Sequence, residues 1–169
     1  MAENNFELHV SEPIPCEVDY QLSEQELAEY FDLQSQLLKE GKRESATMEI
    51  AMLGYALDFL EFAEKAANTK IDFSEESLGL FEAILEAIYN MFSEQAPTGE
   101  AFDDLAKRAT GYFGVLILKN IGGNWVQSNV GMGVNINGTN AFLYNRIARR
   151  LSNGREDEVI SFYEALKNL

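Results

Sequence analysis

The chain has 169 residues, 46% of them hydrophobic, which is enough to build one compact domain with a sizeable core. Its formal net charge of −15 opposes binding to nucleic acid and to anionic membrane surfaces. No apolar run approaches the roughly 20 residues of a transmembrane helix, and residues 1–10 lack the basic and apolar regions of a signal peptide, so we expect a cytoplasmic protein. The single cysteine, Cys16, excludes an internal disulfide and fits a reducing compartment.

Residues 1–22 predict an extended lead-in that can pair as an edge strand of a sheet. Phe6, Leu8 and Val10 alternate with polar residues at the two-residue period of a half-buried strand. Two prolines follow this segment and end any regular pairing.

Four main helices are expected next, each with an apolar face. The spacing of apolar residues places them at about residues 23–41, 45–67, 74–92 and 100–120. Ser23 and Glu26 form a capping box at the start of the first helix, and Ser74 begins the third. Gly111 and Gly114 lie three residues apart inside the fourth helix, where we expect them to let another element approach closely.

The C-terminal part predicts a small antiparallel sheet and two short helices. Strands are expected at residues 124–127, 132–136 and 139–144, and helices at residues 145–151 and from residue 156 onward. Asn137-Gly138 forms the tight turn between the last two strands, because both central residues of such a turn need a positive φ. The predicted fold class is therefore α+β and mostly helical, with residues 23–169 forming a single domain.

The residue types on which most enzyme chemistry depends are scarce. The only imidazole is His9 and the only thiol is Cys16, whose acidic neighbours oppose thiolate formation. Carboxylate pairs at helical spacing have the donor type of a cation site, but on helices this acidic a solvated polar face is the expected interpretation. The glycines near residue 133 lack the context of a phosphate-binding loop. We therefore expect a binding protein rather than an enzyme, with no catalytic residue, no metal and no cofactor.

Charge is divided unevenly along the chain. Residues 1–104 hold 24 acidic and 5 basic residues, whereas residues 105–155 hold no acidic residue at all. The acidic part predicts a surface for a basic protein partner, and solubility is the plainer alternative. The acids that we expect to meet such a partner are Glu61, Glu64, Glu75, Glu76, Glu82 and Glu86.

The acid-free segment leads to a second hypothesis. Arg146 and Arg150 share one face of a short helix beside Arg149, and guanidinium groups bind carboxylates and phosphates bidentately. A pocket for a small anion, or an enzymatic pocket, between the fourth helix and the hairpin would be lined by Tyr112, Trp125, Arg146 and Arg150. Two plainer interpretations stay open: the arginines neutralise acidic helices of their own chain, and Trp125 is a core anchor.

The C-terminal part resembles a family of small uncharacterised bacterial proteins over about residues 105–165. The shared pattern is Gly122-Gly123-Asn124-Trp125, a polar hairpin, a basic helix, Asn153-Gly154 followed by acids, and an aromatic helix, with a glycine-containing helix upstream. This chain departs from the family at Leu143-Tyr144, where proline and an aromatic residue are often found. The resemblance implies a related fold, a bacterial origin and a cytoplasmic setting, and it transfers no residue role. Proteins of this size are common among bacterial immunity genes, which is an analogy only.

Three functional hypotheses follow. The first is an acidic, immunity-like module that docks a basic protein partner. The second is the small anionic-ligand or enzymatic pocket described above. The third is a structural or oligomerisation module built on the glycine-containing helix and the tryptophan hairpin. We expect neither nucleic acid nor membrane as a partner, and the sequence does not specify the oligomeric state.

Overall fold

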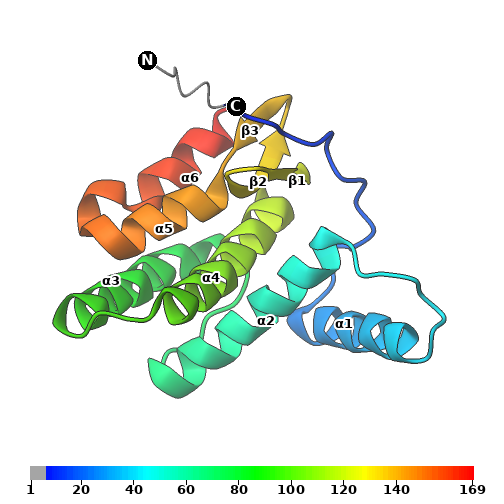
Figure 1. The fold of residues 1–169 in the computed structure, drawn as a ribbon, viewed down its shortest axis with the longest axis horizontal. Helices are drawn as coiled ribbons and strands as arrows, with labels where there is room; N and C mark the ends of the chain where they lie inside the picture. The colour runs from blue at the N-terminus through cyan, green and yellow to red at the C-terminus, as the bar shows by residue number, and fades with distance from the viewer. Residues whose placement is uncertain (1–6) are drawn as a thin grey trace, which may run out of the picture.

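The computed structural model describes residues 7–169 (Figure 1). Along the chain the elements are α1 (Glu24–Lys39), α2 (Met48–Ala66), the 3-10 turn η1 (Glu75–Ser77), α3 (Leu78–Glu94), α4 (Gly99–Asn120), β1 (Asn124–Ser128), β2 (Gly131–Ile136), β3 (Thr139–Ala141), α5 (Leu143–Asn153), the 3-10 turn η2 (Gly154–Asp157) and α6 (Val159–Lys167). This confirms the predicted fold class: four main helices, a small antiparallel sheet and two short C-terminal helices. Among these residues no helix is long and apolar enough to cross a membrane.

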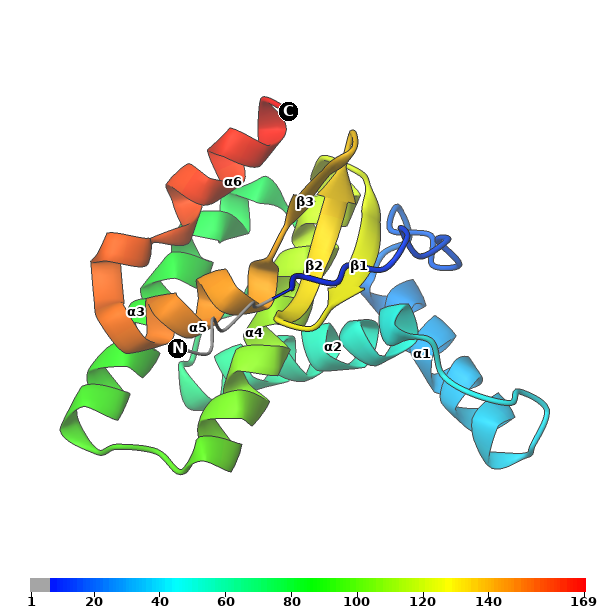
Figure 2. The ribbon, with the colours of Figure 1, turned by 45° about the horizontal axis from the view of Figure 1, so that its top comes forward.

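Helix α4 occupies the centre of the fold. It packs along α2 and against α5, while α3 contacts α5 and α6, and α1 lies outermost against α2 (Figures 1 and 2). Residues 109–118 of α4 are buried without a break. A helix covered on all sides in this way has to bring its neighbours close to its backbone.

The two glycines of α4 provide that close approach, as the sequence predicts. A Cβ atom at Gly111 would lie 2.6 Å from the carbonyl oxygen of Met52 in α2. A Cβ at Gly114 would overlap the ring of Trp125, the first core residue of β1. Each glycine therefore replaces a side chain with a neighbour: the α2 backbone at Gly111 and an indole ring at Gly114.

The starts of the helices follow from local side-chain caps. The capping box at α1 is confirmed, because Ser23 Oγ accepts from the Glu26 N–H at 3.2 Å and the Glu26 carboxylate accepts from the Ser23 N–H at 3.2 Å. Helix α2 begins at Met48, later than the predicted residue 45, because the Thr47 hydroxyl accepts from the Ile50 N–H at 3.3 Å.

The predicted start of the third helix at Ser74 is wrong by one short turn. Ser74 makes no cap hydrogen bond; its hydroxyl and its N–H both donate to Asp72. The Ser77 hydroxyl also donates to Asp72, at 2.8 Å. These bonds favour a 3-10 turn over residues 75–77, and the regular helix α3 begins at Leu78.

The sheet is a three-stranded antiparallel meander of order β1-β2-β3. Asn137 and Gly138 have φ of 50° and 87°, which confirms the predicted tight turn. The third strand is shorter than predicted: it ends at Ala141, and α5 begins at Leu143 rather than residue 145. The reason is packing, because Leu143 and Ile147 are fully buried as successive positions of one helix face.

The N-terminal lead-in runs along the outer edge of β1. Val10 forms an isolated antiparallel bridge with Ser128, and the Ile14 N–H donates to the Trp125 carbonyl at 2.8 Å. Of the strand pattern predicted here, Phe6 lies outside the described residues. The segment therefore covers backbone groups that the edge of β1 would otherwise expose.

A buried carboxylate on α2 holds the end of this lead-in. Glu49 is 1% exposed and accepts from the Glu17 N–H at 2.7 Å, the Val18 N–H at 3.2 Å and the Tyr20 hydroxyl at 2.5 Å. Burial and this carboxylate together raise the pKa of Tyr20 far above its usual value, so the phenol remains a donor. The lead-in is thereby connected to the core through hydrogen bonds rather than through apolar contact alone.

Candidate functional site

Arg150 of α5 is the most deeply buried charge of the predicted site residues. It is fully buried, and its Nε donates to Glu82 Oε1 at 2.6 Å while its Nη2 donates to Glu86. The second oxygen of Glu82 accepts from the Val159 N–H at 3.1 Å. Hydrogen bonding to Arg150 lowers the pKa of Glu86. Two of the acids expected to meet a partner are therefore occupied within the chain, where they compensate a buried guanidinium.

The other arginines of α5 are held less tightly. Arg146 lies 3.4 Å from Asp157 and stacks over the Phe162 ring, with its guanidinium carbon 4.7 Å from the ring centroid. Arg149 reaches the same carboxylate only at 4.0 Å. Carboxylates of the same chain therefore neutralise the charge of Arg150 most completely, that of Arg146 less so, and that of Arg149 least.

Glu75 is also occupied within the chain. It accepts from the Tyr163 hydroxyl at 2.5 Å and forms an ion pair with Lys167 at 3.1 Å. These hydrogen bonds, the first being the larger, lower the pKa of Glu75. Glu76, the next residue, is exposed.

The predicted pocket of Tyr112, Trp125, Arg146 and Arg150 does not form. Tyr112 is fully buried among the rings of Phe59, Phe73 and Phe81, and its hydroxyl donates to the Asp72 carbonyl at 2.6 Å. Trp125 is also buried, and its Nε1 donates to the Tyr20 hydroxyl at 3.2 Å. Both rings are core anchors, because space between α4 and the hairpin is filled by these side chains.

A shallow groove between α1 and α2 brings two of the predicted acids together. Its volume is about 330 Å³, and its lining residues are Glu24, Gln25, Ala28, Leu57, Leu60, Glu61 and Glu64. Leu57 and Leu60 form the apolar floor of this groove, and Glu61 and Glu64 are exposed beside them. Residue Glu24 faces them from the first turn of α1. The groove thus combines an apolar floor with an acidic rim.

The rim keeps only part of its negative charge: Glu61 forms an ion pair with Lys65, one turn further along α2, and the hydrogen bond from Lys65 lowers the pKa of Glu61. Burial raises the pKa of Glu24, and the nearby Asp72 and Glu64 raise it further against the opposing effect of Lys70. On the other side of Glu61, burial raises the pKa of Asp58; Arg108 opposes this rise, and Glu61 and Asp104 add to it. Carboxylates that repel one another in this way are stabilised when a cation approaches.

Sequence reasoning identified Glu61 and Glu64 but missed Glu24 and the apolar floor. Leu57, Glu61 and Glu64 lie at spacings of four and three on α2, so their common face was visible in the sequence. The pairing of this face with the first turn of α1 was not, because it depends on how two helices cross.

Neither the thiol of Cys16 nor the carboxylates of the described residues form a reactive or metal-binding site. Burial, with a smaller contribution from Glu49, raises the pKa of the Cys16 thiol, which disfavours the reactive thiolate. Within residues 7–169, no three His, Cys, Asp or Glu side chains are arranged to hold a metal ion.

Comparison with protein-family models, curated proteins and solved structures finds no match to this chain.

Proposed function

We propose that this protein is a non-enzymatic binding module that docks a basic protein segment in the groove between α1 and α2. The observation that carries the proposal is the combination of an apolar floor, formed by Leu57 and Leu60, with the carboxylates of Glu24, Glu61 and Glu64 around it. Complementary charge at a rim speeds association and selects the partner, while the apolar floor contributes affinity. By analogy with bacterial immunity proteins of similar size, we propose an immunity-like role in the cytoplasm.

The distribution of ion pairs supports this proposal. Ten of the 13 Lys and Arg residues place a nitrogen within 4.0 Å of a carboxylate of the described chain. With 28 acidic residues in the sequence, most of the acidic excess has no internal cation to meet. A basic partner would supply the missing charge.

The geometry also narrows the chemistry of the partner. An apolar floor with acids on both sides matches an amphipathic helical segment. One face of that helix would carry Leu, Ile or Phe side chains, and its flanks would carry Lys or Arg. A uniformly charged peptide would contact the rim and leave Leu57 and Leu60 uncovered. We therefore expect affinity to need both the basic and the apolar residues of the partner.

The test is fluorescence anisotropy with a labelled amphipathic helical peptide of Lys and Leu, compared with an analogue in which Gln replaces Lys. We expect saturable binding of the Lys peptide only, weakening as salt rises from about 50 to about 300 mM. Replacing two rim acids, Glu61→Lys with Glu64→Lys, should lower the affinity by about tenfold, because two attractions become repulsions.

The matched control changes the same charge elsewhere. Glu44 and Glu94 are exposed, the first in the loop between α1 and α2 and the second at the end of α3. The Glu44→Lys and Glu94→Lys pair should weaken binding by less than about threefold, through the net charge alone. If both double variants weaken binding equally, the groove is not the binding site and the acidity acts only as a general field.

A further inference from the structure

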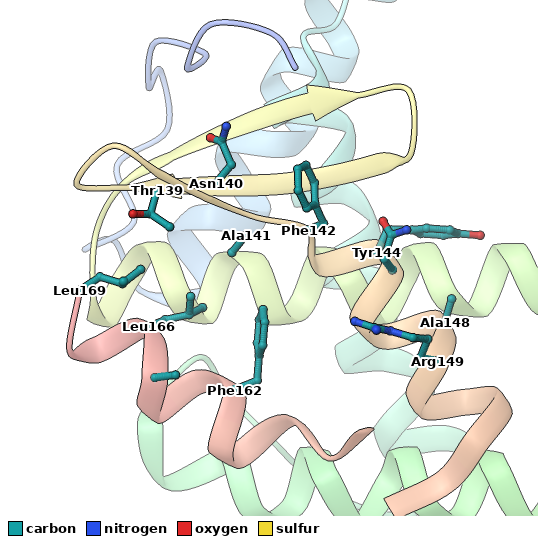
Figure 3. Close-up of a pocket in the computed structure, with 12 residues that line it drawn as sticks. Thr139, Asn140, Ala141, Phe142, Tyr144, Ala148, Arg149, Phe162, Leu166 and Leu169 are labelled. Carbon is teal, nitrogen blue, oxygen red and sulfur yellow. The ribbon is translucent and has the colours of Figure 1, made fainter. Parts of the chain in front are cut away.

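A second groove lies at the other end of the molecule, between β3, α5 and α6 (Figure 3). Its volume of about 660 Å³ falls within the range of small-molecule sites. The lining residues are Thr139, Asn140, Ala141, Phe142, Tyr144, Asn145, Ala148, Arg149, Phe162, Ala165, Leu166 and Leu169. This groove is separate from the one in the proposed function, and it differs from the predicted anion pocket, whose residues pack in the core or pair with carboxylates.

The groove between β3, α5 and α6 has no acidic side chain in its lining. Each of three other cavities in the described structure includes carboxylates: Glu82 and Glu86 in one, Asp58 in another, and Glu24 in the groove between α1 and α2. In a chain of net charge −15, the one of these four cavities that no acidic side chain lines is the one where a small anion meets the least repulsion.

Arg149 supplies a positive charge to this groove. Its side chain is 56% exposed, and its Nε lies 4.0 Å from Asp157, a carboxylate that Arg146 approaches more closely at 3.4 Å. Figure 3 shows the Arg149 side chain extending from α5 toward the space between β3 and α6. Helix α5 also begins without a side-chain cap and without an acidic residue in its first turn, so the positive end of its dipole is not compensated.

The rest of the groove is apolar. Phe142 and Phe162 form opposite walls, from the start of α5 and from α6, and Leu166 continues the α6 wall toward Leu169 (Figure 3). The contact between Arg146 and the Phe162 ring holds that ring in place. Figure 3 shows Arg149 and Leu169 at opposite ends, so a long molecule placing its charged end at Arg149 would lay its apolar part against α6.

We propose that this groove binds an elongated apolar carboxylic acid, of the class of medium-chain fatty acids. The carboxylate would pair with the Arg149 guanidinium, and the alkyl chain would cover the side chains of Phe162 and Leu166. Such a ligand matches both features at once: a half-exposed guanidinium at one end, 4.0 Å from the carboxylate of Asp157, and an apolar wall along the remainder.

The experiment titrates the full chain with sodium decanoate and follows backbone amide resonances by NMR. The comparison ligand is decyltrimethylammonium, which has a similar alkyl chain and the opposite charge. Nonspecific attraction to a protein of net charge −15 favours this cation, so a preference for decanoate can come only from a local site. We expect saturable shifts confined to residues 139–149 and 162–169 with decanoate, and none there with the cation.

Two variants and one control complete the test. Arg149→Gln should weaken decanoate binding by about tenfold, because it removes a charge-assisted hydrogen bond. Ala148→Trp should fill the groove and abolish binding. Arg155→Gln makes the same change of charge at a side chain that is 82% exposed and outside this groove, and it should leave binding unchanged.

Several results would overturn the proposal. These are an absence of saturable shifts up to about 5 mM decanoate, equal binding of decyltrimethylammonium in the groove, or equal weakening by Arg149→Gln and Arg155→Gln. If the resonances of residues 139–149 and 162–169 change with protein concentration before any ligand is added, a second copy of the chain covers this face. That result also excludes the fatty acid. Loss of folding in Ala148→Trp leaves the comparison of the two arginine variants decisive.

Discussion

Replacing Gly114 by alanine tests how tightly α4 is joined to the sheet. The added Cβ would overlap Cη2 of Trp125 and lie 2.5 Å from Cζ2, well inside van der Waals contact. The indole has little freedom to withdraw, because it is 1% exposed and its Nε1 donates to the Tyr20 hydroxyl at 3.2 Å. Either α4 or β1 must therefore shift.

The expected cost follows from these contacts. Overpacking a core by one methyl group typically costs about 1–3 kcal/mol, and the better helix propensity of alanine returns part of it. Because the added Cβ overlaps Cη2 so closely, the upper end of this range applies, and we expect a net loss near 2 kcal/mol in the free energy of unfolding. For a domain of this size such a loss lowers the Tm by roughly 4–8 °C. The shift should also change the emission of Trp125, the only tryptophan of the chain.

The assay is thermal and urea unfolding followed by tryptophan fluorescence and circular dichroism. Gly79→Ala is the matched control, because Gly79 lies in α3 with nothing within 4 Å of its added Cβ. That change should stabilise the protein by about 0.5–1 kcal/mol through helix propensity alone. If Gly114→Ala were as stable as the unmodified protein, with unchanged emission, the close contact between α4 and Trp125 would not be rigid and the reasoning would be refuted.

Three further predictions concern buried and paired charges. Arg150→Ala should destabilise the protein by about 2–3 kcal/mol, measured by urea titration. This is less than the cost of breaking a fully desolvated ion pair, because Glu82 and Glu86 retain some access to water, and Arg155→Ala should change stability little in the same titration. Glu49→Gln should release the lead-in: an amide oxygen is a weaker acceptor than a carboxylate, so the amides of residues 17 and 18 should exchange hydrogen faster, and unaltered exchange would contradict this account. Because the pKa of Glu75 is lowered in the folded protein, its contribution to stability is complete above the unfolded pKa, about 4.3, and is lost as pH falls through the lower folded value. Glu75→Gln should therefore reduce the loss of unfolding free energy at acid pH, measured by urea titration at several pH values, and Glu76→Gln should not.

Local sequence signals predicted the helices and the hairpin well. The capping box at Ser23 and the turn at Asn137-Gly138 depend on interactions within four residues, so the sequence contains everything needed to recognise them. The boundary between β3 and α5 was misplaced because Leu143 fits a strand and a helix equally well in isolation. Its burial in one face with Ile147 decided for the helix.

The candidate site was predicted only in part, and for a related reason. Acidic residues on α2 and α3 look alike in sequence, yet Glu61 and Glu64 are exposed whereas Glu82 and Glu86 contact a buried arginine from α5. Which carboxylates meet that arginine depends on a contact across more than sixty residues of chain. No local pattern reports such a contact.

The sequence by itself determined the fold class, the positions of the main helices, the need for small residues in α4 and the imbalance of charge, because these follow from composition and from spacings within one element. Only the tertiary structure decided which charges remain free. It buried Arg150 between two carboxylates, filled the predicted pocket with Tyr112 and Trp125, and placed a groove without acidic side chains beside Arg149. The physical reason is that burial and pairing depend on the crossing of distant elements, where desolvation outweighs any preference of the residue alone.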